Sequence, residues 1–325
     1  MKRRDFMKGF VGAAVWPSFR REKRSRPLIG FLSSRSRGDS TRILTAFRQG
    51  LAEAGYIAGH DVSIEYRWAG GDYERLPALA ADIVDRSPSV LIAAGGEPSA
   101  LAAKAASDSI PIVFSVGGDP VRTGLVNSLN RPGGNMTGIS LLATELEAKR
   151  LGLLHEMAPR AKVIGVLVDD DFQESQTQTR EIELAARGLG CSVVIACASS
   201  DLELTEAFER LRIAGVDALL VCAAPFFDTR RRSIVAHEAQ QNIPAIYQFR
   251  DYAAEGGLMS YGIRPPEGYR QIGLYAGFIL NGISPSELPV VRPATFELVI
   301  NLRTAAAAGI DVPPSLLACA DEAIS

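Results

Sequence analysis

Short polar and aromatic segments follow the apolar runs of this sequence, and these segments hold the residues whose types could do chemistry. In the first half of the chain they are hydroxyls, glycines, acids and a proline: Ser33, Ser34, Gly95, Gly96, Glu97, Gly118, Asp119 and Pro120. In the second half they are acids, aromatics and a proline: Asp169, Asp171, Phe172, Pro225, Phe226, Phe227, Tyr247 and Tyr261. Glycines let a ligand approach the backbone, and helices that begin after such loops present free N–H groups to an anion. The set suits a small ligand with an apolar or planar body and charges of both signs, such as an amino acid.

Several of these residues also have an ordinary structural interpretation. A Gly-Gly pair after a strand commonly forms a turn. Asp119 and Asp171 belong to a residue type that caps helices. Phe226 and Phe227 can begin a helix and pack into its core. The sequence alone leaves these alternatives open, and a shared function requires that the segments converge on one cleft.

If they converge, the parts of an amino acid can be assigned to them. Asp119 is the first candidate to pair with the ammonium group, and Asp171 is the second. The carboxylate of the ligand would contact Ser33, Ser34 and the N–H groups of the helix that follows them. The side chain of the ligand would rest on the aromatic rings of Phe226, Phe227 and Tyr247.

Catalytic and metal-binding patterns are weak in this sequence. It contains no GxSxG, HExxH or GxxxxGK[ST] motif, and AAGGEPSA lacks the spacing of a dinucleotide site. The three histidines are widely scattered, and no two cysteines form a CxxC pair. Cys191 and Cys197 lie at the two ends of one predicted strand, about 20 Å apart, which excludes a disulfide between them. We therefore expect a binding protein without metal or cofactor rather than an enzyme.

The elements that must position these loops alternate along the chain. LIGFL, DVSIEYRW, SVLIAAGG and IPIVFSVGG are predicted strands, and helices are predicted between them. The helix after the first strand carries Ile43, Phe47 and Leu51 on one face and stops at Gly55. Strands that are apolar throughout are covered on both faces, as in a parallel sheet flanked by helices. The fold class is therefore α/β.

The same plan then repeats at closely similar intervals. Gly30 precedes Gly55 by 25 residues, and Gly165 precedes Gly190 by 25. The proline of SIPIVF follows Gly30 by 81 residues, and the proline of NIPAIY follows Gly165 by 79. This periodicity predicts two similar Rossmann-like lobes, each with its own parallel sheet.

The segments after the second repeat are too short to build a third lobe, so they must complete the first two. We expect residues 28–139 plus 259–290 in the first lobe and 140–258 plus 291–325 in the second, after a basic segment at 1–27. The chain then crosses between the lobes several times, and such a multi-strand hinge creates a cleft. In open parallel sheets ligands bind outside the carboxyl ends of the strands, where the polar loops lie.

Charge is distributed unevenly. Residues 1–26 hold nine Lys/Arg and two Asp/Glu, whereas the rest of the chain has a net charge of −9. A body of that sign repels a phosphate backbone, so we expect no nucleic acid among the partners. The basic start instead indicates an export signal or a membrane-surface arm.

Four long segments, residues 42–84, 110–140, 243–262 and 296–324, resemble the ABC-transporter substrate-binding proteins of the tryptophan/tyrosine-type family. The resemblance covers the chain from about residue 28 to its end. It implies the type I periplasmic-binding fold, two lobes joined by three crossovers, and an amino acid or a similar small organic solute as ligand. It also implies a monomer that serves an ABC permease in the inner membrane and catalyses nothing. The alternative is a ligand-sensing module without a transport role, since bacterial repressors have a similar two-lobed fold behind a helix-turn-helix. Only 27 residues precede the first strand here.

Members of the resembling family commonly begin with an export signal, which agrees with the start of this chain. Lys2-Arg3-Arg4-Asp5-Phe6-Met7-Lys8 looks like a twin-arginine signal, and the apolar stretch 9–19 follows it. We expect localisation in the periplasm. Five basic residues and no A-x-A cleavage site come after the apolar stretch, so the segment could also be retained as a membrane anchor.

Overall fold

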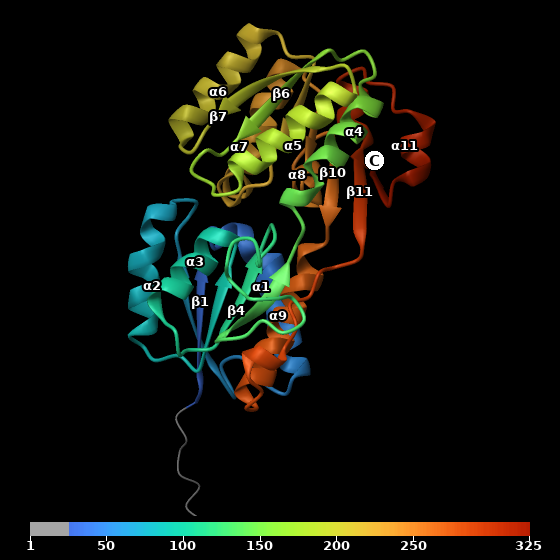
Figure 1. The fold of residues 1–325 in the computed structure, drawn as a ribbon. Coiled ribbons are helices and arrows are strands. Elements are labelled where there is room, and N and C mark those ends of the chain that lie inside the picture. Colours follow the sequence, from blue (N-terminus) through green and yellow to red (C-terminus); the bar gives the residue numbers. More distant parts are fainter. Residues whose placement is uncertain (1–25) are drawn as a thin grey trace, which may run out of the picture.

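The computed structural model describes residues 26–325, and it contains two α/β lobes, one above the other (Figure 1). The predicted export signal falls on residues 1–25, which lie outside the described residues. Within the described part, no helix is long and apolar enough to cross a membrane.

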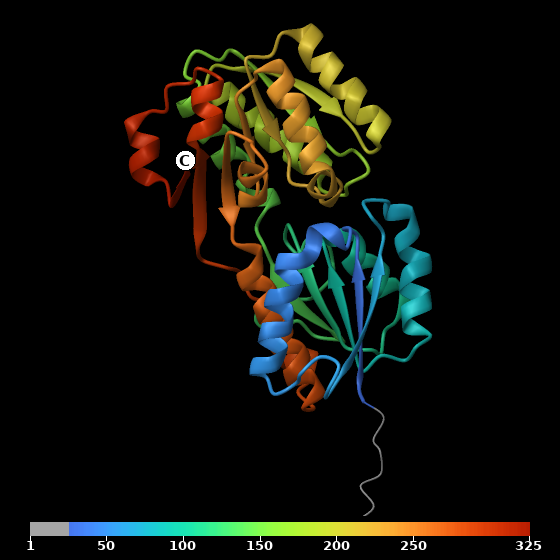
Figure 2. The same cartoon turned by 180° about the vertical axis from the view of Figure 1, so that it is seen from behind.

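The first lobe is built on a five-stranded parallel sheet in the order β2-β1-β3-β4-β5. Its strands are β1 (Leu28–Ser33), β2 (Ser63–Trp68), β3 (Val90–Ala94), β4 (Ile112–Val116) and β5 (Met136–Ser140). Its helices are α1 (Thr41–Glu53), α2 (Leu76–Val84), α3 (Glu97–Ala106) and α9 (Pro265–Leu280). Helices α1 and α9 cover one face, and α2 and α3 cover the other (Figures 1 and 2). Both faces of the sheet are therefore buried, as the uniformly apolar strands predict.

Local sequence explains the close packing of α1 against α9. Ile43, Phe47 and Leu51 face the core from α1, as predicted. A Cβ atom at Gly50 would lie 1.8 Å from the carbonyl oxygen of Arg270, and one at Gly273 would lie 2.1 Å from that of Phe47. The two helices thus touch backbone to backbone, and only glycine fits at these positions.

The second lobe contains a seven-stranded sheet in the order β12-β11-β10-β9-β8-β6-β7. Its strands are β6 (Val163–Val168), β7 (Ser192–Cys197), β8 (Ala218–Val221), β9 (Ala245–Tyr247), β10 (Met259–Ile263), β11 (Phe296–Asn301) and β12 (Glu322–Ile324). Its helices are α4 (Glu147–Met157), α5 (Ser175–Gly188), α6 (Asp201–Ala214), α7 (Pro225–Gln241), α8 (Arg250–Ala254), α10 (Leu302–Ala307) and α11 (Pro314–Cys319). Only β10 and β11 pair antiparallel.

The chain passes between the lobes three times, between β5 and α4, between β10 and α9, and between Val291 and β11 (Figure 1). The predicted lobe boundaries differ from the structure in three places. Residues 259–263 are predicted in the first lobe, but β10 pairs with β9 and β11 in the second sheet. An apolar five-residue strand suits either sheet equally, so the sequence does not indicate which sheet it joins. Ser140 and Val291 are predicted in the second lobe, but Ser140 belongs to β5 and Val291 forms a parallel bridge with Ile139 of the first lobe.

Candidate ligand-binding site

A narrow cavity of about 40 Å³ lies between the lobes, where the carboxyl ends of their strands face each other. The first lobe and the first crossover line it with Arg35, Gly95, Gly96, Glu97, Ser115, Gly117, Leu141, Ala143, Thr144 and Tyr269. The second lobe lines it with Phe172, Ala223, Ala224, Pro225, Asp228, Gln248 and Phe249. This is the position where an open parallel sheet binds its ligand, and here two sheets share it.

Glu97 brings a carboxylate into this cavity from the first turn of α3. Its side chain is fully buried, and its Oε1 atom accepts a hydrogen bond of 2.6 Å from the Gly118 N–H. Burial raises the pKa of this carboxyl group, since the charged form loses its hydration. A cation that reached Oε2 would compensate that loss.

An ion pair between the lobes forms another part of the lining. Arg35 follows β1, and its Nη1 atom lies 3.3 Å from Oδ2 of Asp228, in the first turn of α7. Gln248 donates a 2.7 Å hydrogen bond to the same carboxylate, and Tyr252 donates one of 3.3 Å. Burial raises the pKa of Asp228, and the neighbouring Arg35 opposes that shift. The aspartate therefore has its full set of partners within the protein.

Four buried polar atoms of the lining residues have no hydrogen-bond partner. They are Nε of Arg35, Oε2 of Glu97, Oγ of Ser115 and Oγ1 of Thr144. Buried polar groups in native proteins are almost always paired, because an unpaired one costs roughly 1–3 kcal/mol. A donor, an acceptor and two hydroxyls left without partners around one cavity indicate a place for a polar ligand.

The remaining lining is apolar. Phe172, from the loop after β6, and Phe249, which precedes α8, are both almost fully buried. Leu141 and Pro225 lie on the same lining from the two lobes. The cavity therefore combines a charged part with an aromatic part, as in sites that hold small amphipathic molecules.

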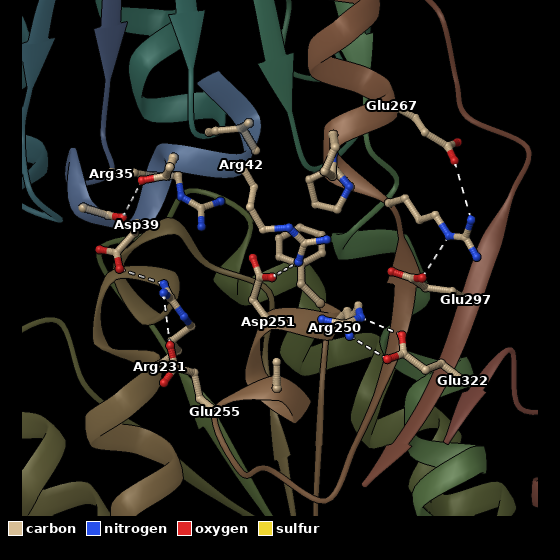
Figure 3. A pocket seen from close by; sticks show the side chains of 18 residues that line it. Arg35, Asp39, Arg42, Arg231, Arg250, Asp251, Glu255, Glu267, Glu297 and Glu322 are labelled. Atoms are coloured by element: carbon tan, nitrogen blue, oxygen red, sulfur yellow. Dashed lines mark hydrogen bonds and ion pairs between the residues drawn. The ribbon is translucent and has the colours of Figure 1, made fainter. Parts of the chain in front are cut away.

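A groove of about 780 Å³ opens on the hinge side of this cavity and shares Arg35 and Phe249 with it (Figure 3). Ion pairs cross the groove from one lobe to the other. Arg231 of α7 lies 2.8 Å from Asp39, and Arg42 of α1 lies 2.6 Å from Asp251. These contacts hold the lobes together at this edge.

A second groove, of about 690 Å³, opens on another side of the interface. Here the Tyr73 hydroxyl of the first lobe donates a 2.8 Å hydrogen bond to Asp169 and accepts one of 3.0 Å from the Phe226 N–H. Burial raises the pKa of Asp169 to about 6, against the opposing hydrogen bonds from Tyr73 and Ser199. Tyr73 thus joins the lobes through the N-terminal end of α7.

The structure brings together some of the predicted site residues and separates others. Those that line the cavity are Gly95, Gly96, Glu97, Phe172 and Pro225. Those that support its wall from behind are Ser33, Ser34 and Gly118, where the Ser34 hydroxyl donates to the Gly95 carbonyl at 2.5 Å. Those that line the groove beside Tyr73 are Asp169, Asp171 and Phe226.

The remaining predicted residues have other partners. Asp119 accepts a 2.8 Å hydrogen bond from the Val121 N–H and, with Pro120, forms a turn outside the cavity. Phe227 packs in the core, and the Tyr247 hydroxyl donates to Glu238 at 3.1 Å. Tyr261 stacks on Phe296 with ring centroids 6.1 Å apart. The geometry therefore moves the candidate partner of an ammonium group from Asp119 to Glu97, since Asp119 already caps its own turn.

Several lining residues were not among the predicted ones, although some carried a signal in the sequence. Arg35 directly follows Ser34, and Gln248 and Phe249 directly follow Tyr247, so these lining residues lie in the same loop segments as predicted site residues. Asp228 lies one turn after Pro225 on α7. Thr144 lies on the crossover that follows β5, a strand that was not among the predicted elements.

Comparison with known proteins gives consistent results. Residues 33–324 match the family model described as ABC transporter substrate binding protein. A tyrosine-binding protein of Clostridioides difficile (strain R20291) is 31% identical over 261 residues, which cover 78% of this chain and 73% of that protein. The solved structure of an ABC domain in complex with L-Trp from Streptococcus pneumonia is 25% identical, with a TM-score of 0.81 over 91% of this chain and 100% of that one.

A second solved structure, a ligand-free, open substrate binding protein with adhesive properties from Clostridium difficile, is also 25% identical. It covers 92% of this chain and 99% of its own, but its TM-score is only 0.64. Identity and coverage are nearly the same for both structures, and the L-Trp complex has the higher TM-score.

Proposed function

The chain belongs to the ABC transporter substrate-binding protein family, and from this premise we propose that the cavity between its lobes binds an amino acid with an aromatic side chain. The fold is the type I periplasmic-binding fold, and the family makes the protein a solute receptor for an ABC importer. This family binds solutes and is not a family of enzymes. No finding supports the alternative of a sensing module without a transport role.

The observation that carries the proposal is the set of unpaired polar atoms around the cavity between the lobes. Oε2 of Glu97 and Oγ1 of Thr144 would accept hydrogen bonds from the ligand's ammonium group. Nε of Arg35 would donate to its carboxylate. A zwitterion supplies a cation and an anion in one small molecule, and it would satisfy all three atoms at once.

The side chain of the ligand would rest on Phe172 and Phe249. Aromatic pairs add about 0.5–1.5 kcal/mol beyond the burial of apolar area. The tyrosine-binding relative and the L-Trp complex support an aromatic ligand, and they do not distinguish between the two amino acids for this chain.

The size of the cavity implies movement. A volume of about 40 Å³ is far below the roughly 300 Å³ at which ligand pockets begin. An aromatic amino acid therefore enters only after the lobes separate, and they close again around it. The three crossovers are the hinge of this motion.

Titration calorimetry with L-tryptophan, L-tyrosine, L-leucine and L-glutamate tests the proposal. We expect saturable binding of an aromatic amino acid, and its loss in Glu97→Gln. Asp119→Asn is the matched control, because Asp119 lies outside the cavity and its replacement should leave affinity unchanged. Absence of binding for every aromatic amino acid would contradict the proposal.

Substrate-binding proteins of ABC importers act outside the cytoplasm. We propose the periplasm as the compartment, an inner-membrane ABC permease as the partner, a monomeric state, and export by the twin-arginine route. Arg3 and Arg4 support that route through their position before Phe6 and Lys8. Replacing both by Lys should leave the protein in the cytoplasm on cell fractionation, and undiminished export would exclude the route.

A further inference from the structure

An ion pair on α4 is completely enclosed by the second lobe. The side chains of Glu147 and Arg150 both have no exposed surface. Oε1 of Glu147 lies 2.8 Å from Nη2 of Arg150, and Oε2 lies 3.2 Å from its Nε. Burying such a pair costs so much hydration that apolar side chains of similar size are often at least as stable. Overall stability is therefore a weak explanation for this pair.

The arginine connects two of the three crossovers. Its Nη2 donates a 2.6 Å hydrogen bond to the carbonyl of Ala143, on the crossover between β5 and α4. Its Nη1 donates a 3.2 Å hydrogen bond to the carbonyl of Tyr261, on β10 and just before the crossover to α9. One planar guanidinium thus fixes both connections relative to each other.

The glutamate connects the same pair to the start of α7. Its Oε1 accepts a 2.9 Å hydrogen bond from the Ala223 N–H and one of 2.8 Å from Nε2 of Gln178. Gln178 also donates a 2.9 Å hydrogen bond to the Ala223 carbonyl. Both backbone groups of Ala223 are therefore held by one small buried network.

The segments held by this network are the cavity wall itself. Ala143, Thr144, Ala223 and Ala224 all line the cavity, and Oγ1 of Thr144 is one of its four unpaired polar atoms. The Thr144 N–H also donates a 3.3 Å hydrogen bond to the Gly117 carbonyl of the first lobe. A shift of Ala143 would therefore move the hydroxyl that faces the ligand and a backbone contact between the lobes.

We propose that Glu147 and Arg150 are positioning residues for ligand binding, which fix Thr144 and the start of α7 to the crossovers so that the closed wall has one geometry. The effect on affinity rests on the proposed function, whereas the effect on the crossover backbone does not. The pair acts through Thr144 and Ala223 and does not touch the cavity itself.

Arg150→Lys tests this with little risk to folding. A lysine keeps the charge beside Glu147, but it lacks the fork that reaches both carbonyls. We expect the dissociation constant for L-tryptophan or L-tyrosine to rise about tenfold, as for the loss of roughly one hydrogen bond to the ligand. Glu147→Gln combined with Arg150→Met is a second variant that leaves no buried charge unpaired. We expect a similar loss for it, with a melting temperature within a few degrees of the wild type.

A double-mutant cycle separates positioning from general stability. Thr144→Val should weaken binding about tenfold in the wild type and less than about twofold in Arg150→Lys, because the hydroxyl is already misplaced there. Additive losses would overturn the proposal. Glu238→Gln is the matched control, because Glu238 is a buried carboxylate of the same lobe that accepts a hydrogen bond from Tyr247, away from the network. Glu238→Gln should leave the affinity unchanged both in the wild type and in Arg150→Lys.

Amide hydrogen exchange of the ligand-free protein distinguishes failure of this inference from failure of the proposed function. In Arg150→Lys, exchange at the Thr144 N–H should accelerate about tenfold or more, while core strands of both lobes keep their protection. If the wild type binds neither amino acid, the proposed ligand is wrong, and exchange at Thr144 still decides the positioning role. Unchanged exchange at Thr144 would overturn it.

Discussion

The two walls of the cavity differ in how their polar groups are satisfied. The first-lobe wall holds Glu97 with a free oxygen and Arg35 with a free N–H group. The second-lobe wall holds Asp228, which is bonded to Arg35, Gln248 and Tyr252, beside the rings of Phe172 and Phe249. The first-lobe wall thus has charged groups with unpaired atoms, and the second-lobe wall has a paired charge beside an aromatic surface.

This difference separates two tasks of recognition. The first-lobe wall would bind the ammonium and carboxylate groups that all amino acids share. The second-lobe wall would select the side chain. Changes in the first wall should therefore weaken all amino-acid ligands, and changes in the second should alter the order among them.

The largest effect is expected at the first wall. Glu97→Gln leaves a buried ammonium group without its carboxylate, which should weaken binding ~30- to 1,000-fold. The loss should be similar for L-tryptophan, L-tyrosine and any aliphatic amino acid that binds. Calorimetry measures it, with Asp119→Asn as the control. A loss confined to one of the ligands would show that Glu97 contacts a side chain instead.

At the second wall, Phe172→Ala should reduce affinity about tenfold for L-tryptophan and L-tyrosine, because it removes a ring contact and buried area. An aliphatic amino acid such as L-leucine should lose less. The quantity to measure is the ratio of dissociation constants in the variant and the wild type. Equal losses for aromatic and aliphatic ligands would break the division between the walls.

Lowering the pH through the pKa of Glu97 should weaken binding, and calorimetry across a pH series measures this; burial raises that pKa above its usual value near 4.3. Only ionised Glu97 attracts an ammonium group, so this attraction is complete above its pKa and is lost as the pH falls through it.

The protonation of Asp169 has the opposite effect on the pH dependence of binding. Its pKa of about 6 in the closed form exceeds the usual value near 3.9, so closure takes up a proton and is favoured at acidic pH. That gain is lost as the pH rises through about 6. In Glu97→Gln, affinity should therefore improve slightly on acidification, and a continued decline would contradict these assignments.

The smallest effect is expected at the edge of the interface. Tyr73→Phe removes the two hydrogen bonds that Tyr73 makes to Asp169 and Phe226, and should weaken binding roughly three- to tenfold. The loss should be the same for all ligands, because Tyr73 acts on closure. Small-angle scattering should show a larger radius of gyration for the ligand-free variant, and an unchanged radius together with unchanged affinity would exclude this role.

The sequence predicted the architecture well, because apolar strands without alternation indicate a parallel sheet and because the two halves share their spacing. Gly95, Gly96 and Glu97, predicted from their place in a loop after a strand, line the cavity between the lobes, and their role in binding stays a prediction. The sequence did not place β10, because neighbours in a sheet depend on the three-dimensional path of the chain.

Asp119 was predicted to meet the ammonium group, whereas in the structure its carboxylate caps its own turn. Which of these two roles an aspartate has depends on local geometry that the sequence does not carry. The Asp119 carboxylate already accepts a hydrogen bond from the Val121 N–H. Phe226 and Phe227 show the same limit. Once α7 begins at Pro225, both rings pack in the core, and only Phe226 of the two also lines the groove beside Tyr73. Their adjacency alone could not distinguish them.

The central claim is that Glu97 recognises the ammonium group of an amino acid held between the lobes. Calorimetry of L-tryptophan against indole-3-propionate, which lacks only that group, tests it most directly, with L-tyrosine and its deaminated analogue as the second pair. The wild type should prefer the amino acid by about 100-fold or more, and Glu97→Gln should lose most of that preference. A preference that persists undiminished in Glu97→Gln would contradict the claim.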